Sequence, residues 1–166
     1  MAIILAFPVL IGLVVVQTVI VSRLPLLLGT ADLIMLALIG WALQERVKSA
    51  WIWTIIGGAM VSFLSAVPFF ALLVSYLIIT SLSRLLQKRI WQTPILAMFV
   101  ATFLGTIITQ GLTILALEVK GVPINIQEAL RLVVLPSLLL NLILALPLRA
   151  IMVNLAEWVY PVEIQL

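Results

Sequence analysis

The chain has 166 residues, of which 65% are hydrophobic and only 9% are charged; its formal net charge is +3, and it contains neither cysteine nor histidine. A soluble domain has roughly 45–50% apolar and about 25% charged residues, and a core of this size cannot hide such an excess. This composition excludes a soluble globular domain, disulfides, thiolate or imidazole catalysis and most zinc or haem sites. It predicts an all-α, polytopic membrane protein with a single domain over residues 1–166, in which the lipid bilayer covers the apolar surface.

Six apolar segments approach the length of a membrane-spanning helix, which needs about 20 residues to cross ~30 Å of hydrocarbon. In chain order they cover residues 3–22, 24–43, 50–66, 68–86, 93–117 and 129–153. The first segment lacks a basic start and a small-residue cleavage site, so we expect it to be retained as a helix. Pro68 marks the connection between the third and fourth segments, and Pro136 and Pro147 are expected to break the sixth.

The basic residues indicate the orientation of this six-helix bundle. On the side of both termini lie Arg46, Lys48, Arg84, Lys88, Arg89 and Arg149, and on the other side lie Arg23, Lys120 and Arg131. Because loops rich in Lys and Arg stay inside, both termini are predicted in the cytoplasm, and the positive charge is no sign of a nucleic-acid partner. The ends on that side also carry all the tryptophans, Trp41, Trp51, Trp53, Trp91 and Trp158, which are expected to lie at the membrane–water interface.

One acid, Asp32, lies in the second apolar segment, shortly after Gly29 in the stretch "GTAD". Its side chain can cap the N–H groups of a helix that runs from Leu33 to about Val47, which would be roughly 22 Å long. Such a helix is short for a full span, so the preceding "RLPLLLG" is predicted to form a separate entry segment, bent at Pro25 and Gly29. The alternative for Asp32 is a direct role in binding a ligand or a partner, because polar residues inside membranes are often functional.

The sixth segment carries Ser137 and Asn141, which are four residues apart and therefore share a helix face. Asn141 lies near the middle of the membrane, where an amide is expected to face protein or water. It either makes an interhelical hydrogen bond that fixes packing or belongs to a site for a partner helix or a small ligand. The structural or partner-binding candidates of the chain are therefore Arg23, Gly29, Asp32, Pro136, Ser137, Asn141 and Pro147.

Catalysis has little support in the sequence. No segment contains paired carboxylates, no serine or threonine has a visible base beside it, and no glycine-rich phosphate loop is present. We therefore expect no enzymatic activity, no cofactor and no metal centre.

Two stretches resemble the bacterial rod shape-determining protein MreD family. The stretch "GTADLIMLALIGWAL" has the family's glycine, short gap and Asp-Leu pair at the start of the second span, and "LPSLLLNLILALPL" is similar to the Pro–Asn–Pro pattern of the last span. The length, the six spans and the longer loop after the fifth span also fit this resemblance.

The resemblance implies a non-catalytic scaffold in the bacterial cytoplasmic membrane, within the machinery that elongates the peptidoglycan cell wall. It implies a single-span MreC-like partner and cooperation with the MreB filament, with the polymerase RodA and with the transpeptidase partner of RodA. The family fold is thought similar to the substrate-binding subunits of energy-coupling-factor vitamin transporters, so a transporter subunit is the alternative. A third reading is an accessory subunit of another membrane complex.

Overall fold

The computed structural model describes residues 2–19, 27–89 and 93–161. Within these ranges the protein is all-helical, with 83% helix and no strands. The helices are α1 (Ala2–Val19), α2 (Leu33–Ala42), α3 (Ala50–Leu64), α4 (Phe69–Arg89), α5 (Pro94–Val119), α6 (Ile126–Ala129) and α7 (Leu135–Val159), and a π-helical turn (Leu130–Val134) joins α6 to α7.

Four helical stretches are long and apolar enough to cross a membrane. They are α1, α4, α5 and the continuous stretch Ile126–Val159 that contains α6 and α7. Their outward faces expose large apolar side chains such as Phe70 and Ile143. Contact of these side chains with lipid is favourable, whereas their contact with water is not. These helices indicate a membrane-embedded protein. The other two predicted spans are the shorter apolar helices α2 and α3.

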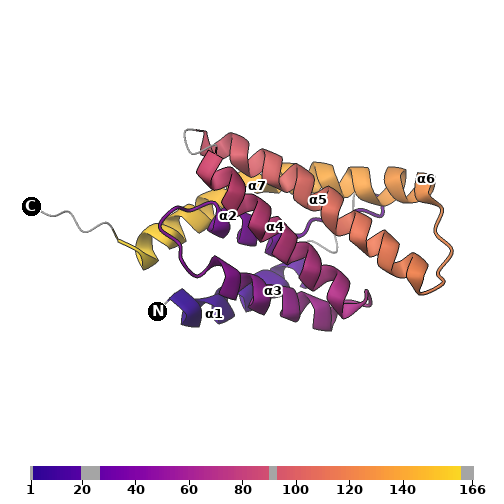
Figure 1. Cartoon of the computed structure of the whole chain (residues 1–166), viewed down its shortest axis with the longest axis horizontal. Helices are drawn as coiled ribbons and strands as arrows, with labels where there is room; N and C mark the ends of the chain where they lie inside the picture. Colours follow the sequence, from indigo (N-terminus) through magenta and orange to yellow (C-terminus); the bar gives the residue numbers. More distant parts are fainter. Residues whose placement is uncertain (1, 20–26, 90–92, 162–166) are drawn as a thin grey trace, which may run out of the picture.

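The short helix α2 is enclosed by the rest of the protein. Figure 1 shows α1 and α3 along one edge of the molecule, α5 and α7 along the opposite edge, and α4 crossing between them. Helix α2 packs against all five of these helices, and every one of its residues is buried. Two glycines allow this close packing. A Cβ atom at Gly57 of α3 would lie 3.3 Å from Ile34 Cγ2 of α2. A Cβ atom at Gly105 of α5 would lie 3.4 Å from Ile39 Cδ1 of α2.

Helix α2 ends at Ala42, so the prediction of a helix continuing to about Val47 was wrong. Ten residues cover only about 15 Å, roughly half of the hydrocarbon thickness. The last carbonyls of α2 are satisfied locally, by Leu43 N, which donates to Ile39 O, and by Gln44, whose Nε2 donates to Gly40 O at 3.1 Å. Beyond the helix end, Arg84 of α4 donates hydrogen bonds to the loop carbonyls Gln44 O, at 3.2 Å, and Val47 O. A cation at the C-terminal end of a helix also complements the helix dipole. Arg84, interpreted from the sequence as a topology signal, thus fixes the loop that follows α2.

The two ends of the described chain lie at the same end of the bundle, at the start of α3. Trp53 Nε1 donates to Ala2 O at 2.9 Å, and Ser49 Oγ lies 3.2 Å from Tyr160 Oη. The loop after α2 and the last turns of α4 meet at this end too, through the contacts of Arg84. The helices therefore alternate in direction along the chain, as the six predicted segments require.

Two of the tryptophans are not at a lipid interface, contrary to the prediction. Trp41 and Trp53 are fully buried, and their rings stack with centroids 4.3 Å apart. Their position near helix ends suggested an interfacial belt, but the faces on which they lie are covered where α2 and α3 pack together. Trp51 and Trp158 are exposed. Trp91 lies outside the described residues.

The last span is longer and less interrupted than predicted. It begins at Ile126, and α7 continues through Pro147 to Val159. The predicted break at Pro147 was wrong: its ring lies on an exposed side of α7, and a membrane helix can continue past a proline when neighbouring groups compensate for the lost bond. Pro136, by contrast, follows the π-helical turn and lies in the first turn of α7.

Candidate functional site

Residues 28–32 lead into α2 along the start of the last helix. Leu28 N donates to Leu132 O at 3.0 Å. In a regular helix this carbonyl would accept a bond from the residue four positions later, but that residue is Pro136, which has no N–H. The proline therefore leaves a backbone acceptor for the neighbouring segment to use.

Gly29 lies where this segment touches the backbone of the last helix. A Cβ atom there would lie 2.6 Å from Ser137 N, 2.7 Å from Pro136 Cβ and 2.9 Å from Val133 O. These distances are below contact, and two of the three atoms belong to the backbone, so only glycine fits without a shift. The next residue is also tied to α7, because Thr30 N donates to Ser137 Oγ at 3.1 Å.

Asp32 caps α2, which confirms the capping prediction. Its Oδ1 accepts a bond from Met35 N at 2.9 Å, and its Oδ2 accepts a bond from Tyr76 Oη of α4 at 2.6 Å. Its backbone N–H donates to Asn141 Oδ1 of α7 at 2.8 Å. Both carboxylate oxygens therefore accept hydrogen bonds from groups inside the protein.

Asn141 makes the interhelical hydrogen bond that the sequence predicted. Its Oδ1 accepts from Asp32 N, and its Nδ2 donates to Thr106 Oγ1 of α5 at 3.0 Å. Gln17 of α1 adds a further helix, since its Oε1 accepts bonds from Leu33 N at 2.8 Å and from Ile34 N at 3.4 Å. These bonds join α1, α2, α4, α5 and α7 at one point. We call the six side chains the polar junction: Gln17, Asp32, Tyr76, Thr106, Ser137 and Asn141.

The structure brings most of the predicted residues together at the polar junction. They are Gly29, Asp32, Pro136, Ser137 and Asn141. Pro147 lies further along α7, apart from them, and Arg23 lies outside the described residues. Sequence reasoning missed Gln17, Tyr76 and Thr106, although an amide within the apolar run of α1 was a usable signal.

The polar junction provides hydrogen-bond partners for the backbone that leads into α2. Irregular backbone at membrane depth is tolerated only where protein or a water-filled cavity satisfies its polar groups. The N–H groups of Leu28, Thr30, Asp32 and Leu33 all donate to partners within the protein. These four N–H groups at the entry to α2 are therefore paired within the protein and do not face lipid unpaired.

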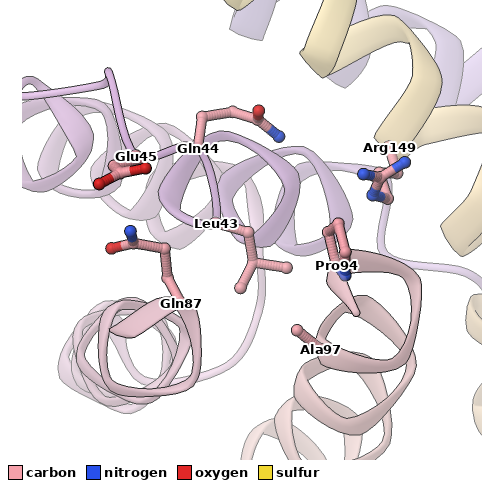
Figure 2. Close-up of a pocket in the computed structure, with 7 residues that line it drawn as sticks. All are labelled: Leu43, Gln44, Glu45, Gln87, Pro94, Ala97 and Arg149. Atoms are coloured by element: carbon pink, nitrogen blue, oxygen red, sulfur yellow. The ribbon is translucent and has the colours of Figure 1, made fainter. Parts of the chain in front are cut away.

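Two small cavities lie apart from the centre of this junction. One, of about 180 Å³, lies between α1 and α3 and is lined in part by Gln17, Thr18 and Ser65. The other, of about 160 Å³, lies beyond the C-terminal end of α2 and is shown in Figure 2. Its lining residues are Leu43, Gln44, Glu45, Gln87, Pro94, Ala97 and Arg149. Among the described residues there is no group of three or more Asp, Glu, His or Cys side chains that could hold a metal ion.

Replacing Asn141 with leucine is expected to lower the apparent melting temperature in detergent by about 4 °C. The change removes the acceptor of Asp32 N and the donor to Thr106 Oγ1, which keeps only its bond to Thr102 O. An interhelical polar contact in a membrane contributes about 0.6–2 kcal/mol. Asn154→Leu is the matched control, because Asn154 is exposed on the same helix. Equal melting temperatures for the two variants would contradict the packing role of Asn141.

Comparisons with protein-family models, with curated proteins and with solved structures gave no match to this chain.

Proposed function

We propose that this chain is a non-catalytic scaffold of the cell-wall elongation machinery, similar to the MreD family, with six spans in the bacterial cytoplasmic membrane. The observation that carries this proposal is the internal use of Asp32. Both of its carboxylate oxygens accept bonds that fix α2 and α4, so this acid serves the arrangement of helices. A scaffold needs such a fixed arrangement, because its function is to present a constant surface to other proteins.

The two stretches that resemble the MreD family meet in space, which supports the same proposal. Asp32 and Asn141 are 109 positions apart in the sequence, yet they are joined by a hydrogen bond of 2.8 Å. Gly29 of the first stretch fits against Pro136 and Ser137 of the second. Motifs that are distant in sequence and adjacent in structure are expected when both encode one architectural feature.

The proposed orientation, with both termini in the cytoplasm, is supported by where the charges lie. The end of the bundle that holds Ala2 and Tyr160 also holds the basic loop after α2 and the basic last turn of α4. Cytoplasmic loops carry an excess of Lys and Arg. The proposed partners are a single-span MreC-like protein, the MreB filament, RodA and the transpeptidase partner of RodA.

One observation favours a second candidate, the substrate-binding subunit of a vitamin transporter. The cavity between α1 and α3 lies beside Gln17, at the end of α2 that carries the polar junction. Its volume is about 180 Å³, however, whereas pockets for vitamin-sized ligands enclose roughly 300–1,000 Å³. This cavity is therefore too small for a vitamin-sized ligand.

Purification of the tagged chain from its native host in mild detergent, followed by mass spectrometry, tests this proposal. We expect an MreC-like protein to co-purify, and we expect depletion of the chain to turn rod-shaped cells into rounded ones. Co-purification of a pair of ATPases with a bound vitamin would establish the transporter subunit instead. Co-purification with an unrelated complex, with cell shape preserved on depletion, would favour an accessory subunit and contradict the scaffold.

A further inference from the structure

The cavity in Figure 2 is lined by charged and amide side chains to which the proposed scaffold function assigns no role. It lies at the end of the bundle that holds Ala2 and Tyr160, between the loop after α2 and helices α4, α5 and α7. Leu43 and Ala97 are buried beneath it, and the remaining lining residues are partly or fully exposed. Because its volume is about 160 Å³, it accommodates a small polar group.

One side of the cavity is suited to an anion. Arg149 lines this side of the cavity and carries the positive charge among its lining residues. Pro94 begins α5 on the same side, and the side chain of the capping residue, Thr93, makes no bond to the first turn. A helix N-terminus and a guanidinium group together favour a phosphate group, which accepts hydrogen bonds from both.

The opposite side of the cavity is suited to a cation. Figure 2 shows Glu45 and Gln87 on the side away from Arg149. Gln44 lines the cavity between these two sides, and its Nε2 donates to Gly40 O at 3.1 Å, which orients its amide. A carboxylate repels a ligand that is purely anionic but accepts hydrogen bonds from an ammonium group.

We propose that this cavity binds the headgroup of a phospholipid that carries both a phosphate and a primary ammonium, as phosphatidylethanolamine does. The phosphate lies beside Arg149 and the start of α5, and the ammonium lies beside Glu45 and Gln87. A lipid is the source because the cavity opens at the end of membrane-spanning helices, next to the basic last turn of α4, where headgroups lie.

This assignment makes a specific chemical prediction about which lipids are rejected. The trimethylated ammonium of phosphatidylcholine has no N–H to donate to Glu45. Phosphatidylglycerol has no cationic group, and Glu45 repels its charge. The proposal therefore requires preference for phosphatidylethanolamine over both, which a general attraction of Lys and Arg for anionic lipid does not produce.

Native mass spectrometry of the purified chain, titrated with each of the three lipids, tests this preference. We expect phosphatidylethanolamine to be retained at least fivefold more than the other two lipids. Equal retention of all three, or stronger retention of phosphatidylglycerol, would overturn the proposal. Excess glycerophosphoethanolamine is expected to leave the retained lipid unchanged, and complete displacement would assign the cavity to a soluble phosphate ester instead.

Variants of the two charged residues locate the binding site. Arg149→Gln is expected to reduce retention of phosphatidylethanolamine at least fivefold, and Arg149→Lys to reduce it less. Glu45→Gln is expected to abolish the preference over phosphatidylglycerol. The matched control is Arg46→Gln, which removes a nearby charge outside the cavity; an equal loss in this control would overturn the assignment. Because Glu45 is exposed, its variant keeps the test informative even if Arg149→Gln fails to fold.

Discussion

Replacing Gly29 with alanine is expected to lower the apparent melting temperature in detergent by about 6 °C or more. The added methyl group would lie 2.6 Å from Ser137 N and 2.9 Å from Val133 O, and backbone atoms of a helix cannot move aside as a flexible side chain can. Overpacking of this kind costs about 1–3 kcal/mol, and each kcal/mol shifts the melting temperature of a chain of this size by roughly 2–4 °C. A thermal scan by intrinsic fluorescence measures the effect.

Two other glycines provide matched controls with the opposite expected sign. Gly12 and Gly111 lie within α1 and α5, and a Cβ atom at either position would meet nothing within 4 Å. Alanine favours a helix over glycine by about 1 kcal/mol, so these variants should keep or raise the melting temperature. If Gly29→Ala behaves like Gly111→Ala, then the contact between residues 28–32 and α7 is not what fixes this region.

Replacing Asp32 with alanine is expected to lower the stability by about 2–4 kcal/mol. Loss of the cap on Met35 N costs about 1 kcal/mol, and the buried hydroxyl of Tyr76 is left without its acceptor, which costs about 1–3 kcal/mol. The apolar segment itself is unchanged, so the variant should still insert into the membrane. In cells, it should weaken the association with an MreC-like partner and disturb cell shape, both measured against the expression level in the membrane.

A double-mutant cycle separates the hydrogen bond from other effects of this change. Tyr76→Phe removes the donor, so the pair Asp32→Ala and Tyr76→Phe should cost less than the sum of the single variants. Glu128→Ala, at an exposed acid on α6, serves as the control for loss of one negative charge. Strict additivity in the cycle, or normal rods and normal co-purification in Asp32→Ala cells, would contradict the structural role of this acid.

The start of α2 could be predicted from the sequence because capping is a local interaction. The side chain of Asp32 reaches the N–H group of Met35, three residues ahead, and the short stretch "DLIM" contains both residues. The path of the loop after α2 could not be predicted, because Arg84 binds its carbonyls Gln44 O and Val47 O from 40 and 37 positions away. A sequence pattern carries information about residues that are close along the chain. It does not reveal a hydrogen-bond donor that is tens of positions away.

The same distinction explains which parts of the polar junction were foreseen. Asn141 was predicted to need a partner because an amide in lipid is costly, but its partners Asp32 and Thr106 come from other helices. Tyr76 was overlooked because a tyrosine in an apolar helix is usual and only its contact with Asp32 gives it a role. The tryptophan prediction failed at Trp41 for a related reason, since helix packing, not position along the chain, decides its burial.

The complete enclosure of α2 has a consequence for how the protein is made. The segment of α2 is synthesised early. The side chains that bind its N-terminal end, Ser137 and Asn141, belong to α7, 107 and 109 positions further along the chain from their partners. Until translation of that helix is finished, the approach to α2 lacks these hydrogen-bonding partners. The entry to α2 therefore gains these hydrogen bonds only after α7 has been made, although α2 itself is synthesised much earlier.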